Sequence, residues 1–384
     1  MQCIQCGTHS RLRERKDGRC AKCQHRFVFE PTTDPSWITD LQFKRAVGRV
    51  SGDGTVRFTA RNLWYEVHRR WALRGVVRQP ASLFWAAVAG AVVGALPLVM
   101  LAKLFAVPAL YWLSAVGAVG MGALTVYANW RANTAPPFKH GPPSMRFEVF
   151  QKQHLPRWIE VNGPIPGLLP PREEAAAVMP RQVPPDVAAF SFDRALVTDR
   201  WETAAMLVAN RFHFEHNCAV LSVDGYPDGI ADTIKEMLRR NPRLTVFALH
   251  DASLAGCHLP FVLREPAWFP DPRVRIVDLG LRPEIAKRLR LPELQGSSAF
   301  RPPELMESLS PEDQQWLTEG HSSELAALRP TQLMRAAYKG IVAAGPHDGS
   351  VGIPATAGAL YGGGMIWIGD PAGGADTAAV DGFG

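Results

Sequence analysis

Two long stretches without a charged residue limit most strongly what this chain can fold into. Residues 81–102 and residues 109–129 contain no Asp, Glu, Lys or Arg. At 1.5 Å per residue, each stretch is long enough as a helix to cross a hydrocarbon layer of about 30 Å. Only Lys103 carries a charge between them. The sequence therefore predicts a two-helix transmembrane hairpin over residues 81–130, with a buried soluble hairpin as the alternative.

Basic residues lie on both outer flanks of this predicted hairpin. They are Arg69, Arg70, Arg74 and Arg78 before it, and Arg131 and Lys139 after it. Because Lys and Arg collect on the cytoplasmic side of membrane proteins, we expect a two-pass protein of the cell inner membrane with both termini in the cytoplasm. The formal charge of +6 comes partly from these arginines, so it is weak evidence for a nucleic-acid partner.

Four of the six cysteines form two CxxC pairs near the N-terminus. Cys3 and Cys6 are followed, after thirteen residues, by Cys20 and Cys23. This spacing is typical of a zinc ribbon, in which two turns each present two sulfurs to one tetrahedral ion. We therefore expect a structural zinc ribbon over residues 1–30 that depends on the metal for folding. Four incidental buried cysteines are the alternative.

The pattern changes after residue 189 to short apolar runs that alternate with amphipathic helical windows, as far as about residue 340. The four β-rich runs are residues 194–199, 219–224, 244–251 and 274–278. This alternation is typical of an α/β fold with a parallel, doubly wound sheet flanked by helices.

Each of the four runs ends in an aspartate: Asp199, Asp224, Asp251 and Asp278. The carboxyl ends of the strands form the ligand crevice of an open α/β sheet. Several carboxylates gathered there would suit Mg²⁺, which prefers oxygen ligands. The alternative is that each aspartate only caps the helix that follows its strand.

The segments LVTDRWETAAML, VDGYPDGIADTIKEMLRR, LTVFALHDASLAG and VDLGLRPE resemble, in order and spacing, the Toprim domain of the topoisomerase VI A subunit and its meiotic double-strand-break relatives. The second segment contains Asp224 and Asp228. In that family a glutamate after the first strand and a DxD after the third hold Mg²⁺. The resemblance places Asp199 at the glutamate, Asp251 at the first aspartate and Ser253 at the second. It therefore implies a Toprim-like domain with a degenerate magnesium site.

A second resemblance concerns FTARNLWYEVHRR at residues 58–70. It is similar to the motif that carries the nucleophilic tyrosine of the same family, with Arg61 at the arginine and Tyr65 at the tyrosine. Thr59 is a helix N-cap candidate, and Leu63 and Val67 begin an apolar stripe at four-residue spacing. Residues 36–80 are thus predicted to be part of a winged-helix-like domain. A tyrosine that only packs on an amphipathic helix is the alternative.

Two segments have the composition of connections. Residues 131–188 contain four Pro-Pro pairs and are predicted to be an extended linker with one β-hairpin around MRFEVFQ and RWIEVNG. Residues 341–384 are rich in glycine and are expected to be disordered.

Two functions follow from these features. The first is a membrane-anchored, catalytically degenerate relative of the topoisomerase VI A subunit that binds DNA or a protein partner. The alternative is an active Mg²⁺-dependent DNA transesterase, in which Tyr65 attacks a phosphodiester and the protein acts as a homodimer. An unrelated nucleotide-binding fold is disfavoured, because the sequence has no GxGxxG after a strand and no GxxxxGK[ST] motif.

Overall fold

The computed structural model describes most of the chain outside the uncharged stretches. The described residues are 1–15, 17–29, 38–77, 145–174, 192–241, 243–296 and 300–345. The chain divides into two compact units, one of residues 1–67 and 140–384 and the other of residues 68–139. All described elements belong to the first unit except the end of helix α2.

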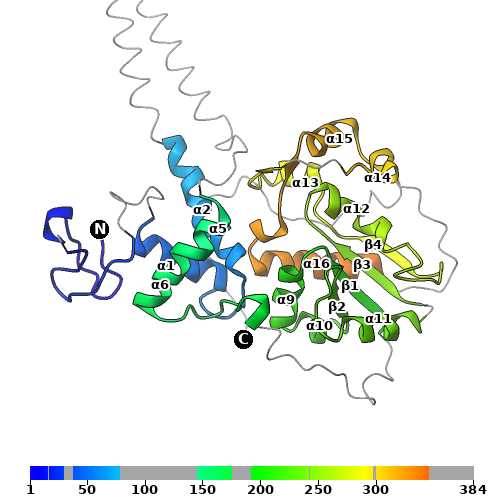
Figure 1. The fold of residues 1–384 in the computed structure, drawn as a ribbon, viewed down its shortest axis with the longest axis horizontal. Helices are drawn as coiled ribbons and strands as arrows, with labels where there is room; N and C mark the ends of the chain where they lie inside the picture. Colours follow the sequence, from blue (N-terminus) through cyan, green and yellow to red (C-terminus); the bar gives the residue numbers. More distant parts are fainter. Residues whose placement is uncertain are drawn as a thin grey trace, which may run out of the picture. The chain divides into compact units, whose positions relative to one another are not determined.

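A four-stranded parallel sheet organises the C-terminal half of the first unit (Figure 1). Its strands are β1 (Arg194–Thr198), β2 (Ala219–Ser222), β3 (Thr245–Leu249) and β4 (Arg275–Asp278). They lie in the order β2-β1-β3-β4, so the chain reverses its direction of travel across the sheet between β1 and β3. The α/β class and the four predicted strands are confirmed, because each predicted run contains one strand of this sheet.

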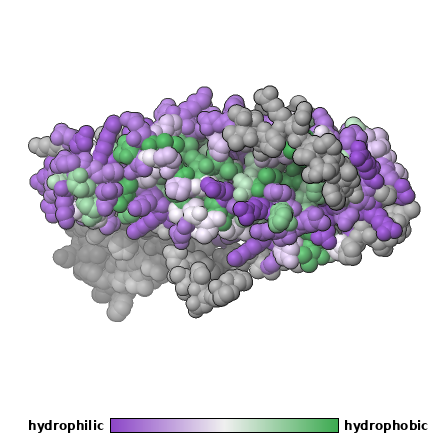
Figure 2. All heavy atoms as spheres, turned by 90° about the horizontal axis from the view of Figure 1, so that it is seen from below, coloured by the Kyte–Doolittle hydropathy of each residue, from purple (hydrophilic) through white to green (hydrophobic). Residues whose placement is uncertain are grey.

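Alternate residues of the strands face two different cores. Leu196, Val220 and Phe247 pack in one buried cluster with helices α9 (Trp201–Ala209) and α16 (Pro330–Ala344). Ala195, Val197 and Val246 pack in a second cluster with α11 (Ala231–Arg239) and α12 (Leu254–Val262). Both faces of the sheet are thus covered, as a parallel sheet requires. On the face drawn in Figure 2, the described surface is largely hydrophilic, with apolar side chains gathered towards its middle.

Short elements complete the C-terminal half. They are α10 (Phe212–Glu215), α13 (Pro283–Arg288), β5 (Leu294–Gln295), α14 (Pro303–Ser308), α15 (Pro311–Thr318), β6 (His321–Ser322) and the 3₁₀ turn η3 (Leu325–Ala327). Strands β5 and β6 form a separate antiparallel pair. Ala252 forms an isolated bridge with Ser323, which brings the end of β3 next to η3. This contact positions the buried Glu324, which follows Ser323 directly.

Helices form the N-terminal half between the cysteine pairs and the sheet. They are α1 (Asp40–Ser51), α2 (Ala60–Val77), α5 (Phe147–Val149), the π-helical turn η2 (Phe150–His154) and α6 (Leu155–Asn162). The β-hairpin predicted around residues 145–163 is therefore wrong. Phe150, His154 and Trp158 recur every fourth residue, and Phe150 and Trp158 pack on Phe43 of α1, so a helix buries these rings together.

The predicted transmembrane fold is corrected. Within the described ranges, none of the helices is both long and apolar enough to cross a bilayer. Helix α2 has 18 residues but carries charged side chains such as Arg61 and Glu66. This finding contradicts the two-pass topology and the inner-membrane location predicted from the sequence. The segments on which that prediction was based, residues 81–102 and 109–129, lie outside the described residues, as do most of the predicted linker and almost all of the glycine-rich tail.

Candidate functional site

The four N-terminal cysteines come together. Their sulfur atoms all lie within 4.8 Å of one another, with 3.6 Å between Cys3 and Cys23 and 3.6 Å between Cys6 and Cys20. Metal–sulfur bonds of about 2.3 Å in a tetrahedron would give sulfur–sulfur edges of roughly 3.8 Å. All four cysteines are free thiols. The cluster is therefore the right size and chemistry to hold a metal ion such as zinc.

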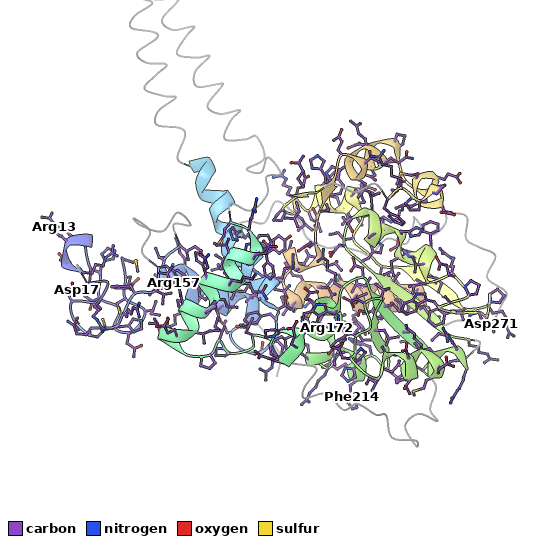
Figure 3. All side chains as sticks on the ribbon, in the orientation of Figure 1. Arg13, Asp17, Arg157, Arg172, Phe214 and Asp271 are labelled. Atoms are coloured by element: carbon purple, nitrogen blue, oxygen red, sulfur yellow. The ribbon has the colours of Figure 1, made fainter. Side chains whose placement is uncertain are left out.

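Two similar turns build this cluster. The amide of Gly7 donates to the carbonyl of Cys3, and the amide of Gln24 donates to the carbonyl of Cys20, each at 3.0 Å. Gly7 and Gln24 both have positive φ, which lets each turn close behind its cysteine pair. Antiparallel bridges close the turns at Gln2 with His9 and at Arg19 with Arg26. Figure 3 labels Arg13 and Asp17, which belong to the connection between the turns.

The thiols of the cluster differ in how readily they lose a proton. Hydrogen bonds with the side chain and backbone of Thr8 lower the pKa of Cys6 to about 6, which favours its thiolate form. A backbone hydrogen bond at His25 lowers the pKa of Cys23, but burial and the neighbouring sulfurs outweigh it and raise that pKa to about 12. A cation among the four sulfurs would favour the thiolate form of all of them.

At the other candidate site, the sheet brings Asp199 and Asp251 together. Asp199 follows β1 and Asp251 follows β3, and these strands are neighbours at the point where the strand order reverses. The amide of Asp251 donates to Oδ2 of Asp199 at 2.9 Å. Their convergence follows from the strand order.

Arg200 neutralises this acidic pair. Its Nε donates to Oδ2 of Asp251, and its Nη2 lies 3.0 Å from Oε1 of Glu324. The amide of Leu325 donates to the remaining oxygen of Asp251 at 2.7 Å. Both oxygens of Asp251 are thus already bonded to protein groups. Oδ1 of Asp199 is buried and has no hydrogen-bond partner among the described residues. Magnesium is therefore not supported, because a guanidinium already provides the positive charge that the carboxylates need.

The pKa shifts agree with a buried charge cluster. Burial raises the pKa of Asp199, and burial together with the charge of Asp199 raises the pKa of Asp251 well above its usual value. Burial lowers the pKa of Arg200, but the charges of Asp251 and Glu324 outweigh burial and raise it. Arg200 thus stays charged. The pair of Asp199 and Asp251 binds a proton more tightly than an isolated carboxylate does.

Tyr65, the predicted nucleophile, is buried. Its side chain belongs to a residue only 2% exposed, and its hydroxyl donates to Oε2 of Glu324 at 3.1 Å. Arg61 pairs with the same carboxylate at 2.9 Å, and its guanidinium lies 4.2 Å from the ring centre of Phe147. Burial and the charge of Glu324 raise the pKa of Tyr65 well above 10. The phenol is therefore neutral and turned towards a buried carboxylate.

The other predicted ligands have structural partners. Ser253 accepts a hydrogen bond from the amide of Gly256 and so caps α12. Asp224 accepts from the amide of Trp201 at the start of α9 at 3.1 Å. Asp228 pairs with Arg172 at 2.7 Å. The capping alternative, in which each aspartate caps the helix after its own strand, does not describe Asp224, because α9 follows β1 and Asp224 follows β2.

The fourth strand-end aspartate, Asp278, forms a separate, partly buried pair with His250. His250 Nε2 lies 3.0 Å from Oδ1 of Asp278, and Nδ1 lies 2.9 Å from the carbonyl oxygen of Asp251. Because both neighbours are acceptors, both ring nitrogens donate and the ring is positively charged. Burial lowers the pKa of His250, but the interaction with Asp278 raises it well above the usual value.

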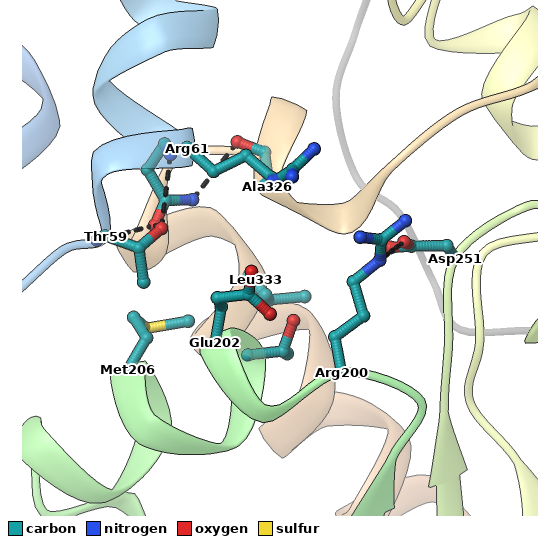
Figure 4. Close-up of a pocket in the computed structure, with 10 residues that line it drawn as sticks. Thr59, Arg61, Arg200, Glu202, Met206, Asp251, Ala326 and Leu333 are labelled. Atoms are coloured by element: carbon teal, nitrogen blue, oxygen red, sulfur yellow. Dashed lines mark hydrogen bonds and ion pairs between the residues drawn. The ribbon is translucent and has the colours of Figure 1, made fainter. Parts of the chain in front are cut away.

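A small pocket lies beside the charge cluster, between the first turns of α2 and α9 (Figure 4). The close-up shows the side chain of Arg200 turned towards Asp251. The sequence analysis did not predict two residues of this site. They are Arg200, which binds Asp251, and Glu324, which binds Arg200, Arg61 and Tyr65. Arg200 is next to Asp199 in the sequence, which was the available signal. Glu324 lies far away along the chain, and no motif marks it.

Replacing Tyr65 with phenylalanine is expected to leave the protein folded. Glu324 keeps two arginine partners in this variant, so we expect a loss of only about 1 kcal/mol of unfolding free energy, measured by urea denaturation. Tyr338→Phe, at a half-exposed position, serves as the control and should change stability by less than about 0.5 kcal/mol. Covalent protein–DNA adducts that disappear in Tyr65→Phe would contradict this structural role.

Comparisons with known proteins leave the chain without an assigned family. Protein-family models, curated proteins and solved structures all give no significant match. They give no support to the predicted resemblance to the topoisomerase VI A subunit and its Toprim domain, so the fold is not assigned to that family. What the described residues do establish is a four-stranded parallel α/β fold together with a four-cysteine cluster able to hold a metal ion.

Proposed function

We propose that this chain is a non-catalytic nucleic-acid-binding protein that contacts phosphates through its four-cysteine ribbon. The observation that carries the proposal is the charge of the ribbon surface. Five basic side chains of the ribbon are exposed: Arg11, Arg13, Arg19, Lys22 and Arg26. Nucleic-acid binding by a small domain depends on such a group of cations, because each phosphate contact releases a condensed counterion.

Few acidic groups offset these cations. Glu14 and Asp17 are the exposed acids among the described residues of the ribbon. Arg26 lies 3.5 Å from Glu160, but both side chains are largely exposed, so water screens the pair and leaves Arg26 available. Lys44 of α1 is also exposed and donates to the carbonyl of Ile4, which adds a cation next to the ribbon. The local excess of positive charge favours an anionic partner.

Zinc is the metal that best fits the proposed ribbon. Zn²⁺ binds four thiolates tetrahedrally, has no redox chemistry and closes a structural site without an open position. The metal would hold the two turns together and so fix the spacing of the basic side chains that they carry. In this proposal the metal has no direct contact with the nucleic acid.

Two features outside the ribbon support a non-catalytic role. Tyr65 is buried against Glu324, and both oxygens of Asp251 are bonded to protein groups. A nucleophile needs access to its phosphodiester, and a metal that activates a leaving group needs open oxygen ligands. Neither condition is met by these residues as they lie.

The proposal is tested by removing ribbon charge. We expect the double variant Arg19→Gln with Lys22→Gln to bind a fluorescent DNA duplex about tenfold or more weakly at 0.1 M salt, measured by anisotropy. The matched control is Arg335→Gln with Lys339→Gln, which removes the same two charge types from exposed positions of α16. Equal losses in both variants, or no binding by the unaltered protein, would contradict the proposal.

A further inference from the structure

The aromatic rings of the ribbon are buried. Its Phe, Tyr and Trp residues are Phe27 and Phe29 alone. Phe27 is 7% exposed and packs with Cys3 and Cys20, and the guanidinium of Arg15 lies 5.7 Å from its ring centre. Phe29 is fully buried and packs against Phe43. The described residues of the ribbon therefore present cations without an exposed phenyl or indole ring on which a nucleobase could stack.

The described surface of the ribbon lacks the exposed aromatic rings that proteins commonly use to hold single-stranded nucleic acid. Proteins that bind single strands place aromatic side chains along a basic groove, because unstacked bases gain most of their binding energy by stacking on those rings. In a double helix the bases are already stacked on each other, and the protein meets a regular array of phosphates. A surface of cations without exposed rings matches the second target.

The available side chains also favour contact with the backbone over base readout. Arginine and lysine on short turns bind phosphate oxygens, and such contacts fix position without carrying sequence information. Direct readout requires an element that enters a groove, usually a helix or a two-stranded ribbon. The described residues of the cysteine ribbon contain isolated bridges and one turn of 3₁₀ helix, η1 (Leu12–Glu14), but no regular strand or α-helix.

We propose that the ribbon recognises double-helical nucleic acid through its phosphates and independently of base sequence. This inference rests on the proposed nucleic-acid-binding function and adds the class of nucleic acid. It predicts that the affinity falls as the salt concentration rises, and that a duplex binds more tightly than a single strand. With up to five phosphate contacts, the slope of log K against log salt should lie between roughly −3 and −4.5 for a DNA duplex.

The test compares duplexes with their own strands. The full-length protein, loaded with zinc, is titrated into fluorescent DNA duplexes of about 20 base pairs with two unrelated sequences, into the separated strands, and into an RNA duplex. We expect both DNA duplexes to bind equally within a factor of about three, and their single strands to bind about tenfold more weakly at 0.1 M salt. Arg13→Gln should reduce the salt slope by about 1. Tighter binding of the RNA duplex than of its own strands also supports the proposal.

One control variant helps to separate this inference from the proposed function. His9 is the exposed imidazole of the ribbon, and His9→Ala should leave duplex binding unchanged. Single strands that bind as tightly as duplexes, a loss of binding in His9→Ala, or a preference of more than tenfold between the two duplex sequences would overturn this inference while leaving nucleic-acid binding in place. Absence of salt-dependent binding to every probe would instead overturn the proposed function itself.

Discussion

Removing a metal bound to the four cysteines with a chelator is expected to unfold residues 1–27 while the four-stranded sheet stays folded. The buried apolar cluster of the ribbon consists of Cys3, Cys20 and Phe27. A core this small cannot offset the entropy of ordering the chain. In zinc-finger peptides the metal supplies about 10–16 kcal/mol of apparent binding free energy, which is also their folding free energy. The ribbon should therefore depend on its metal in the same way.

Amide hydrogen exchange measures this effect directly. Protection of the amides of Gly7 and Gln24, which close the two turns, should be lost after chelation or in Cys20→Ser, and that of Val246 in the central strand should not. Cys218→Ala is the matched control, because Cys218 is a buried cysteine of the α/β half. Metal analysis of the purified protein should find zinc in a stoichiometric amount. Protected turns in metal-free protein would show that the cysteines are only packed together.

The strands could be predicted from the sequence because their signal is local. The runs ending at Asp199 and Asp251 consist of apolar and β-branched residues that favour a buried strand whatever their neighbours. The two aspartates meet because of the strand order, which no local sequence pattern predicts. Arg200 neutralises them because its side chain points towards them, and the sequence does not predict that direction either. The sequence thus singled out both aspartates, but their role in a functional site stays a prediction, and the guanidinium beside them could not be predicted.

The helices at residues 147–162 were missed for a different reason. The many prolines of the surrounding segment favoured an extended linker, yet Phe150, His154 and Trp158 stand at helical spacing. Their rings pack on Phe29 and Phe43, which lie more than a hundred residues earlier in the chain. Helical periodicity was present in the sequence, but only the distant partner surface shows that this face is buried. Contacts of this kind override local composition.

Replacing Arg200 with methionine is expected to destabilise the α/β half by about 3 kcal/mol at neutral pH. The change removes the cation that lies between Asp251 and Glu324, both of which are nearly fully buried. Breaking a buried ion pair by removing one partner usually costs 3–5 kcal/mol. We expect the low end of this range, because the side chain of Arg200 is 38% exposed and water can replace part of its interaction.

The matched control is Arg273→Met, which breaks an exposed pair with Asp271 at 2.7 Å. That pair is solvated, so its loss should change the free energy of unfolding by less than about 1 kcal/mol. Adding Asp251→Asn to Arg200→Met should recover part of the loss, because it removes the charge left without a partner. A loss in Arg200→Met no larger than in the control would show that the buried carboxyls do not depend on this guanidinium.

The pH dependence of the Arg200→Met variant gives the sharper test. In the folded protein, burial and Asp199 raise the pKa of Asp251, and Arg200 opposes that rise. Without Arg200 the pKa rises further above its value in the unfolded chain, which is about 3.9. Protons are then bound more strongly by the folded state, so the penalty is smallest below about pH 4 and grows as the pH rises through the raised pKa. Urea denaturation at several pH values should therefore show the variant approaching the unaltered protein in acid. A penalty that is independent of pH would mean that lost packing, and not the unpaired carboxylate, causes the destabilisation.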